Sequence, residues 1–378
     1  MSKKKKTAKM AGWITMAVCM VIGGFCGVLI VDVVESAGID TNSGLEFMAF
    51  LVLLFVLTYL IVFLQIAIHE GGHLIFGLLS GYEFSSYRIG SLLWMKEDGK
   101  LKMKKYTLAG TGGQCLMRPP KMIDGQIPVV LYNLGGSIMN IVSAILFLVL
   151  AFVIKQEQPL LYCFSLLMGI VGIAFALLNG IPMNMGLVNN DGKNALSLGK
   201  NKAAMRAFWI QLEMNHLLTA GGVSLKDMKK DWFKPVTEED MQNNLTASLA
   251  VFRCNRLMEE MKFSQAAEEM EAIVNGENAV AGLHKSLLKN DMIFCELLDG
   301  CNSEKIEVLL DNDQKKFEKA MKSNPAILRT QYAYALIFEK NQEKADKIKS
   351  IFEKNTKNYP YQTELEIERR NMELADKK

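Results

Sequence analysis

Two histidines and a glutamate stand close together in an apolar part of the chain. They are His69, Glu70 and His73, in the order H-E-x-x-H. On a helix, positions i and i+4 lie one turn apart on one face, so both imidazoles can reach a single zinc ion. In such sites the glutamate does not bind the metal; it takes a proton from the attacking water and later delivers one to the leaving amine. The pattern predicts hydrolysis that depends on Zn²⁺, most often of a peptide bond.

The motif lies at the end of a long apolar run. No formal charge occurs between Phe47 and Ile68, and a run of this length can cross a membrane. Ionisable groups at bilayer depth are costly unless they are used, which favours a functional site. A buried polar cluster that holds helices together is the alternative interpretation. Gly71 and Gly72 either leave room for a metal and a substrate or allow close packing against another helix.

A catalytic zinc site needs a third protein ligand and leaves its fourth position for water. Asp191 is the candidate, because it follows an apolar span that returns the chain to the membrane face of the motif. Asn189, Asn190 and His216 are weaker substitutes. Asn140 is a candidate catalytic residue, since an amide in a dry interior can donate to the oxyanion formed during hydrolysis. Structural hydrogen bonding is the other role open to Asn140.

Four apolar segments have to position these residues. We expect membrane spans at about 12–31, 45–79, 129–154 and 159–178, which together form a membrane domain over residues 1–200. The first span follows Lys3 to Lys6 and Lys9 and lacks a small-residue cleavage site, so we interpret it as a helix rather than a signal peptide. Basic residues are frequent between 81 and 127. By the positive-inside rule this loop and both chain termini are cytoplasmic.

The loop after the motif has the pattern of a β-hairpin. Tyr87 to Met95 and Leu101 to Tyr106 are the expected strands, and Asp98-Gly99 is the turn between them. An extended substrate could pair with the exposed edge of such a hairpin. A solvated hairpin resting on lipid head groups is the alternative.

The second half of the chain is more polar and helical in pattern. Residues 201–235 are expected to form an interfacial helix and a linker, with Phe208, Trp209, Leu212 and Leu217 at the membrane surface. Residues 236–378 form helix pairs. The interval from Pro325 to Pro360 is close to the length of a tetratricopeptide repeat, and the likeness is loose. Capture of a protein partner or substrate is one interpretation, and a plain helical cap is the other.

Composition excludes two other classes of protein. The chain has 43 Lys and Arg against 40 Asp and Glu, and nothing in their distribution indicates nucleic-acid binding. Its 7 cysteines are scattered without a C-x-x-C pair, so a disulfide framework is not expected.

These motifs together resemble the site-2 protease family of intramembrane zinc metalloproteases. The resemblance covers about residues 45–195. It depends on the H-E-G-G-H motif in a membrane helix, on the segment Gly135-Gly136-Ser137-Ile138-Met139-Asn140, and on Asn179-x-x-Pro182 leading to Asp191-Gly192. The family also has a membrane-associated sheet after the first motif, which suits residues 82–106.

The resemblance implies a role for each motif residue. His69, His73 and Asp191 would bind zinc, and Glu70 would be the general base. One spacing differs from the family pattern: Asp191 lies nine positions after Pro182, where the family has five.

We therefore expect an α-helical membrane protein of a bacterial cell membrane, with about four transmembrane helices, a small cytoplasmic β-hairpin or sheet, and an all-α helical-repeat domain. The expected function is hydrolysis of peptide bonds in membrane-embedded or membrane-associated substrates near the cytoplasmic face. A non-catalytic membrane scaffold that recruits a partner through its helical repeats is the alternative. A different family of membrane zinc peptidase, with a glutamate as third ligand, is another.

Overall fold

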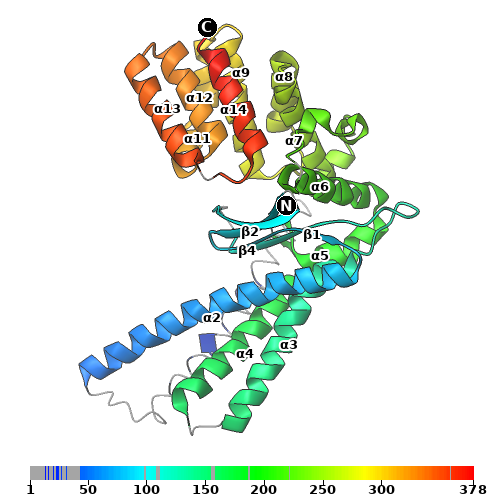
Figure 1. The fold of residues 1–378 in the computed structure, drawn as a ribbon, viewed down its shortest axis with the longest axis vertical. Coiled ribbons are helices and arrows are strands. Elements are labelled where there is room, and N and C mark those ends of the chain that lie inside the picture. Colours follow the sequence, from blue (N-terminus) through cyan, green and yellow to red (C-terminus); the bar gives the residue numbers. More distant parts are fainter. Residues whose placement is uncertain are drawn as a thin grey trace. The chain divides into compact units, whose positions relative to one another are not determined.

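The computed structural model describes residues 43–97, 99–107, 111–154, 158–185, 188–220, 222–357 and 359–378, with seven further positions between 13 and 31. The described residues are mostly helical (Figure 1). They form two compact units, one from Met1–Ser91 with Leu108–Lys202 and the other from Leu92–Thr107 with Ala203–Lys378. Most of the predicted span at 12–31 lies outside the described residues, and its seven described positions are helical.

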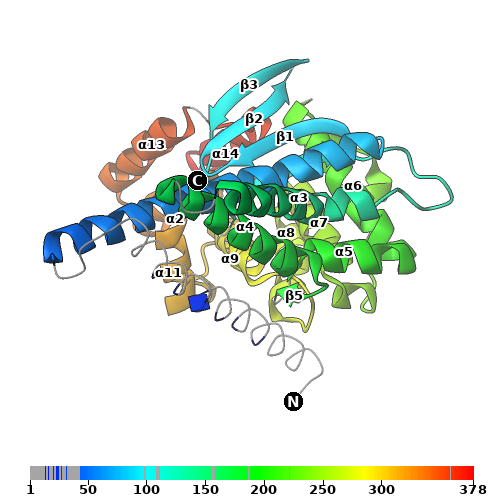
Figure 2. The same ribbon diagram turned by 90° about the horizontal axis from the view of Figure 1, so that it is seen from below.

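Three helices of the first unit are long and apolar enough to cross a membrane, among the residues that the structure describes. They are α2 (Gly44–Leu79), α3 (Val130–Ile154) and α4 (Pro159–Gly180). Their bounds agree with the spans predicted at 45–79, 129–154 and 159–178. All three pack against one another, as both ribbon views show (Figures 1 and 2). The start of α2 is capped by Ser43, whose Oγ accepts a hydrogen bond from the Glu46 N–H.

Small residues bring α2 and α3 into close contact. A Cβ atom on Gly72 would collide with the carbonyl oxygen of Gly135, and a Cβ atom on Gly135 would lie 2.6 Å from the carbonyl oxygen of Gly72. Close helix packing is therefore the role of Gly72. Gly71 faces more open space, because its nearest such neighbour is the Tyr87 hydroxyl at 3.9 Å.

An antiparallel sheet follows α2. Its strands are β1 (Glu83–Ile89), β2 (Leu92–Glu97), β3 (Lys100–Lys105) and β4 (Gly113–Arg118), in the spatial order β3-β2-β1-β4. The predicted hairpin around residues 98 and 99 is confirmed, since Glu97 pairs with Lys100. The single strand predicted from Tyr87 to Met95 is wrong. A turn at Gly90, with a φ of 55°, divides that segment into β1 and β2.

Apart from β2 and β3, the described part of the second unit is helical. Its helices are α6 (Lys202–Ala220), α7 (Asn244–Glu259), α8 (Phe263–Asn275), α9 (Gly282–Leu298), α10 (Ser303–Leu309), α11 (Asn312–Ala320), α12 (Pro325–Ala333), α13 (Gln342–Thr356) and α14 (Gln362–Ala375). The π-helical turn η5 (Tyr334–Phe338) continues α12, and three 3₁₀ turns lie between α6 and α7, at Leu225–Asp227, Lys230–Phe233 and Asp240–Gln242. The helix pair predicted between Pro325 and Pro360 is present as α12 and α13.

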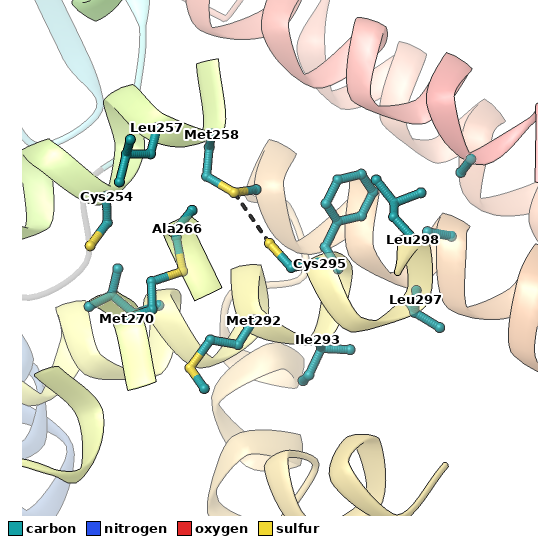
Figure 3. Packing of buried hydrophobic residues seen from close by; sticks show 14 of the residues in the cluster. Cys254, Leu257, Met258, Ala266, Met270, Met292, Ile293, Cys295, Leu297 and Leu298 are labelled. Atoms are coloured by element: carbon teal, nitrogen blue, oxygen red, sulfur yellow. Dashed lines mark hydrogen bonds between the residues drawn. The ribbon is translucent and has the colours of Figure 1, made fainter. Parts of the chain in front are cut away.

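Apolar and sulfur-containing side chains fill the core of this region (Figure 3). Cys295 and Met258 are in contact there, with 3.4 Å between their sulfur atoms. Burial raises the pKa of the Cys295 thiol to about 12, so this cysteine behaves as a small apolar side chain.

The helix predicted at the membrane surface uses its apolar side chains differently. Within α6, Phe208 and Leu212 are buried in the protein, at 8% and 6% exposure. Neighbouring α6 residues pack with Trp232 and Phe233 in a small core. Phe208 and Leu212 therefore face a protein core, because a pattern of apolar residues on a helix does not distinguish a lipid surface from a core; the location of α6 at the membrane surface stays a prediction.

Candidate metal centre

Three side chains from two elements converge at one point. His69 and His73 lie one turn apart on α2, and Asp191 is the first residue of α5 (Asp191–Ser197). The His69 Nε2 atom is 3.1 Å from Asp191 Oδ2 and 3.2 Å from His73 Nε2. The His73 Nε2 atom is 3.4 Å from Asp191 Oδ2. Among the residues that the structure describes, these three side chains form a group that could hold a metal ion.

The separations between these atoms match a tetrahedral zinc site. Ligand atoms at about 2.0–2.1 Å from zinc in tetrahedral geometry lie about 3.3–3.4 Å from one another. The three observed separations, 3.1, 3.2 and 3.4 Å, are close to this value. Three protein ligands would leave the fourth position open, as in catalytic rather than structural sites.

The other nitrogen of each imidazole faces an acceptor. His69 Nδ1 lies 2.7 Å from the Asn140 side-chain oxygen, and His73 Nδ1 lies 2.7 Å from the Tyr132 carbonyl oxygen. Both Nδ1 atoms therefore donate, and in neutral imidazoles both Nε2 atoms carry a lone pair directed at the shared point. Two lone pairs and a carboxylate oxygen repel one another unless a cation or a proton lies among them. The chemistry of the donor set therefore suits a divalent metal.

A short hairpin places Asp191 despite the long spacing from Pro182. Strands β5 (Asn184–Met185) and β6 (Val188–Asn189) pair antiparallel, so the additional residues form a loop that leaves and returns. Asn190 closes its base: the backbone N–H of Met183 donates to its side-chain oxygen at 2.9 Å. The same oxygen caps α5 by accepting from the Lys193 N–H. The hairpin thus absorbs the extra length and leaves Asp191 beside the two histidines.

The carboxyl group of Asp191 is ionised in this setting. Its burial acts to raise the pKa, but an imidazole of His69 or His73 that carries a proton on Nε2 donates a hydrogen bond and adds positive charge, which together hold the pKa well below its usual range. A carboxylate is the form that binds a metal.

Glu70 lies next to this centre and against strand β4. A Cβ atom on Gly113, at the start of β4, would lie 2.7 Å from Glu70 Cγ and 2.8 Å from its Oε1. The backbone N–H of Cys115, also in β4, donates to the Glu70 carboxylate. The strand therefore holds Glu70 beside the two imidazoles without making it a member of the ligand group. This is the position expected of a general base.

Asn140 has a different set of partners from that of an oxyanion donor. Its amide nitrogen donates to the Gln65 side-chain oxygen at 2.7 Å and is 3.1 Å from the Gln65 carbonyl oxygen. Because both amide hydrogens face Gln65, Asn140 cannot donate to an oxyanion without losing these bonds. These contacts fit the structural hydrogen-bonding role that the sequence left open for Asn140, and its catalytic role stays a prediction.

The weaker candidates for the third ligand are not part of this group. Asn190 closes the loop as described, and the Asn189 side chain donates to the Asn194 side chain at 3.3 Å. His216, on α6, is not in the ligand group of the described residues.

Sequence reasoning missed three contributors to the centre. Gln65 accepts a hydrogen bond from Asn140, the Tyr132 carbonyl oxygen lies at His73 Nδ1, and Gly136 makes room for the His69 ring, which a Cβ atom there would strike. Of these, Gln65 carries a signal in the sequence, because it is a polar residue inside an otherwise apolar run.

Comparison of the chain with protein-family models, with curated proteins and with solved structures found no match.

Proposed function

We propose that this protein is an intramembrane zinc metalloprotease similar to the site-2 proteases. The observation that carries the proposal is the convergence of His69 Nε2, His73 Nε2 and Asp191 Oδ2 at separations of 3.1 to 3.4 Å. Ionisable side chains placed beside an apolar helix bundle cost free energy, so their presence there favours a functional role such as metal binding. When bound, a zinc ion supplies a Lewis acid that makes water nucleophilic near neutral pH.

The chain's own residues then have defined tasks. Glu70 accepts the proton of the attacking water and returns one to the leaving amine. Asn140 and the Tyr132 carbonyl fix the two imidazoles so that their Nε2 atoms stay directed at the metal. Cys115, through its backbone N–H, holds Glu70 in place.

The substrate in this proposal is a peptide segment in or at the membrane. Strand β4 is an edge of the sheet and lies against Glu70. A locally extended substrate could pair with that edge and present its backbone to the centre. We further propose four spans, cytoplasmic termini and a bacterial cell membrane as the location, as the charge distribution predicts. The C-terminal helices remain available for a protein partner.

Replacement of Glu70 tests the mechanism. Glu70→Gln keeps the shape of the side chain and removes the base, so hydrolysis of a membrane-embedded peptide in proteoliposomes should fall by about 10²–10⁴-fold or more. Zinc content should stay at the wild-type level, because Glu70 is not a ligand. Glu46→Gln, at the start of the same helix, is the matched control and should keep full activity.

Two results would contradict the proposal. Hydrolysis by Glu70→Gln at the wild-type rate would exclude Glu70 as the base. A wild-type protein that binds no zinc would favour the non-catalytic scaffold instead.

A further inference from the structure

We propose that Gln65 is a positioning residue of the metal centre, which acts on His69 through the side chain of Asn140. The inference rests on the proposed zinc site and deepens it, because it identifies what fixes the orientation of one ligand.

Gln65 is fully buried at the contact of three helices. Its exposure is 0%, and it lies one helical turn before His69 on α2. Its amide nitrogen donates to the Met168 carbonyl oxygen on α4 at 2.9 Å. The same nitrogen lies 3.3 Å from the Ser143 hydroxyl on α3. The Ser143 hydroxyl also lies 3.4 Å from the Gln65 side-chain oxygen, so it suits either end of the amide. The Met168 carbonyl can only accept, so it fixes the amide nitrogen toward α4 and leaves the amide oxygen to face Asn140.

The orientation of Gln65 in turn determines that of Asn140. The amide nitrogen of Asn140 faces two oxygen atoms of Gln65, the side-chain oxygen and the backbone carbonyl. A flipped Asn140 amide would place its own oxygen against both of them. Its nitrogen has to face Gln65, and its oxygen therefore has to face His69 Nδ1.

The orientation of Asn140 then decides the state of His69. An acceptor 2.7 Å from Nδ1 requires the proton to be on Nδ1. That leaves the Nε2 lone pair free for the metal. Were Asn140 to present its NH₂ group instead, the proton of the neutral ring would move to Nε2, and His69 would be unable to bind.

The surrounding helices are shaped to accommodate this chain of contacts. Gly172 on α4 faces the Gln65 amide, and a Cβ atom there would lie 3.0 Å from its nitrogen. Gly136 on α3 faces the His69 ring in the same way. The alternative role for Gln65 is that of a polar contact that only holds α2, α3 and α4 together. The two roles differ in whether zinc binding responds through Asn140.

A double-mutant cycle on zinc affinity separates these roles. The full-length protein in detergent is titrated with zinc against a competing chelator, with no substrate present. Loss of an outer partner of a metal ligand typically weakens binding about 10–100-fold, and we expect this for Gln65→Met and for Asn140→Leu. We expect the double variant to bind zinc no more weakly than Asn140→Leu alone, because both changes remove the same effect.

A second variant keeps the test valid if Gln65→Met does not fold. Gln65→Asn keeps an amide near α3 and α4 but is one methylene too short to reach Asn140, so it should also weaken zinc binding about 10-fold or more. Ser165→Ala, a buried polar change on α4, is the control and should leave zinc affinity unchanged.

The outcomes distinguish this inference from the proposed function. Wild-type zinc affinity in Gln65→Met or Gln65→Asn, or losses that add in the double variant, would overturn the positioning role and leave the zinc site intact. Absence of zinc binding by the wild type would overturn both.

Discussion

Two buried polar clusters in this protein are built on opposite plans. In the C-terminal helices, Arg329 is 1% exposed and is paired with two carboxylates. Its Nη2 atom lies 2.5 Å from Asp291 Oδ1, and its Nε atom lies 2.8 Å from Glu368 Oε2. In the first unit, which contains α2, α3 and α4, the Nε2 atoms of His69 and His73 face a carboxylate oxygen of Asp191. We call this unit the membrane unit. The first cluster contains a permanent cation, whereas the second has one only when an imidazole is protonated or a metal ion binds.

This contrast distinguishes a structural cluster of buried charges from a candidate metal-binding site. A buried charge that is there for stability is accompanied by its counter-charge, as Arg329 is. A group of acceptors that face one another is stable only when a proton or a metal ion lies among them, which makes it a candidate binding site. The predictions that follow test whether the two clusters differ in this way.

Removal of the cation should damage the C-terminal cluster most. Arg329→Met would leave Asp291 and Glu368 buried beside each other, which should destabilise that region by about 3–5 kcal/mol. Hydrogen exchange of α9, α12 and α14 in the full-length protein would measure the loss. Zinc affinity should not change.

An exposed ion pair in the same region provides the control. Arg369 contacts Glu353 with both side chains substantially exposed, at 41% and 52%. Arg369→Met should therefore cost about 1 kcal/mol or less. Equal effects from Arg329→Met and Arg369→Met would show that the buried cluster is not the stabilising unit we describe.

Gly136→Ala should damage the membrane cluster by a steric route. The new methyl group would meet the His69 ring, with Nδ1 and Nε2 each 2.6 Å away. Overpacking of this kind costs about 1–3 kcal/mol, which corresponds to a loss of about 5–150-fold in zinc affinity. Chelator competition would measure it. Gly44→Ala, where a Cβ atom meets nothing within 4 Å, is the matched control, and equal affinities in the two variants would argue against a packed His69.

A smaller effect should appear in the pH dependence of the C-terminal region. Burial and the neighbouring Glu368 carboxylate raise the pKa of Glu364 to about 7. The folded region then keeps a proton that the unfolded chain loses above about pH 4.3. Its stability should fall as the pH rises from about 4.3 to 7 and level off above 7.

Glu364→Gln removes this titration. Its unfolding midpoint should change less between pH 5 and 8 than that of the wild type, when followed in the α14 segment of the full-length protein. Identical pH profiles would mean that Glu364 does not keep its proton on folding.

The sequence predicted the elements of the membrane unit well, because long apolar runs leave few alternatives. The bounds of α2, α3 and α4 agree with three predicted spans. The approach of the two imidazoles was predictable for the same kind of reason, since helical spacing alone places His69 beside His73. Asp191 needed more information. Its distance from Pro182 differs from the family pattern, and only the pairing of β5 with β6 explains how it returns to the site.

The partners of Asn140 and the surroundings of α6 were beyond the sequence. Gln65 and Asn140 are 75 positions apart, so no local pattern reveals which atoms of the two amides meet. Phe208 and Leu212 have the spacing of a membrane-surface helix, yet they are buried in a protein core. Both features concern contacts between distant segments, which depend on packing rather than on periodicity.

Zinc content tests the central claim most directly. We expect the purified wild-type protein to retain about one equivalent of zinc per chain after dialysis. Asp191→Ala should lose it, because two imidazoles alone make an incomplete site. Asp124→Asn, an exposed change in the same unit, should keep it. Zinc-free wild-type protein, or full zinc retention in Asp191→Ala, would contradict the account.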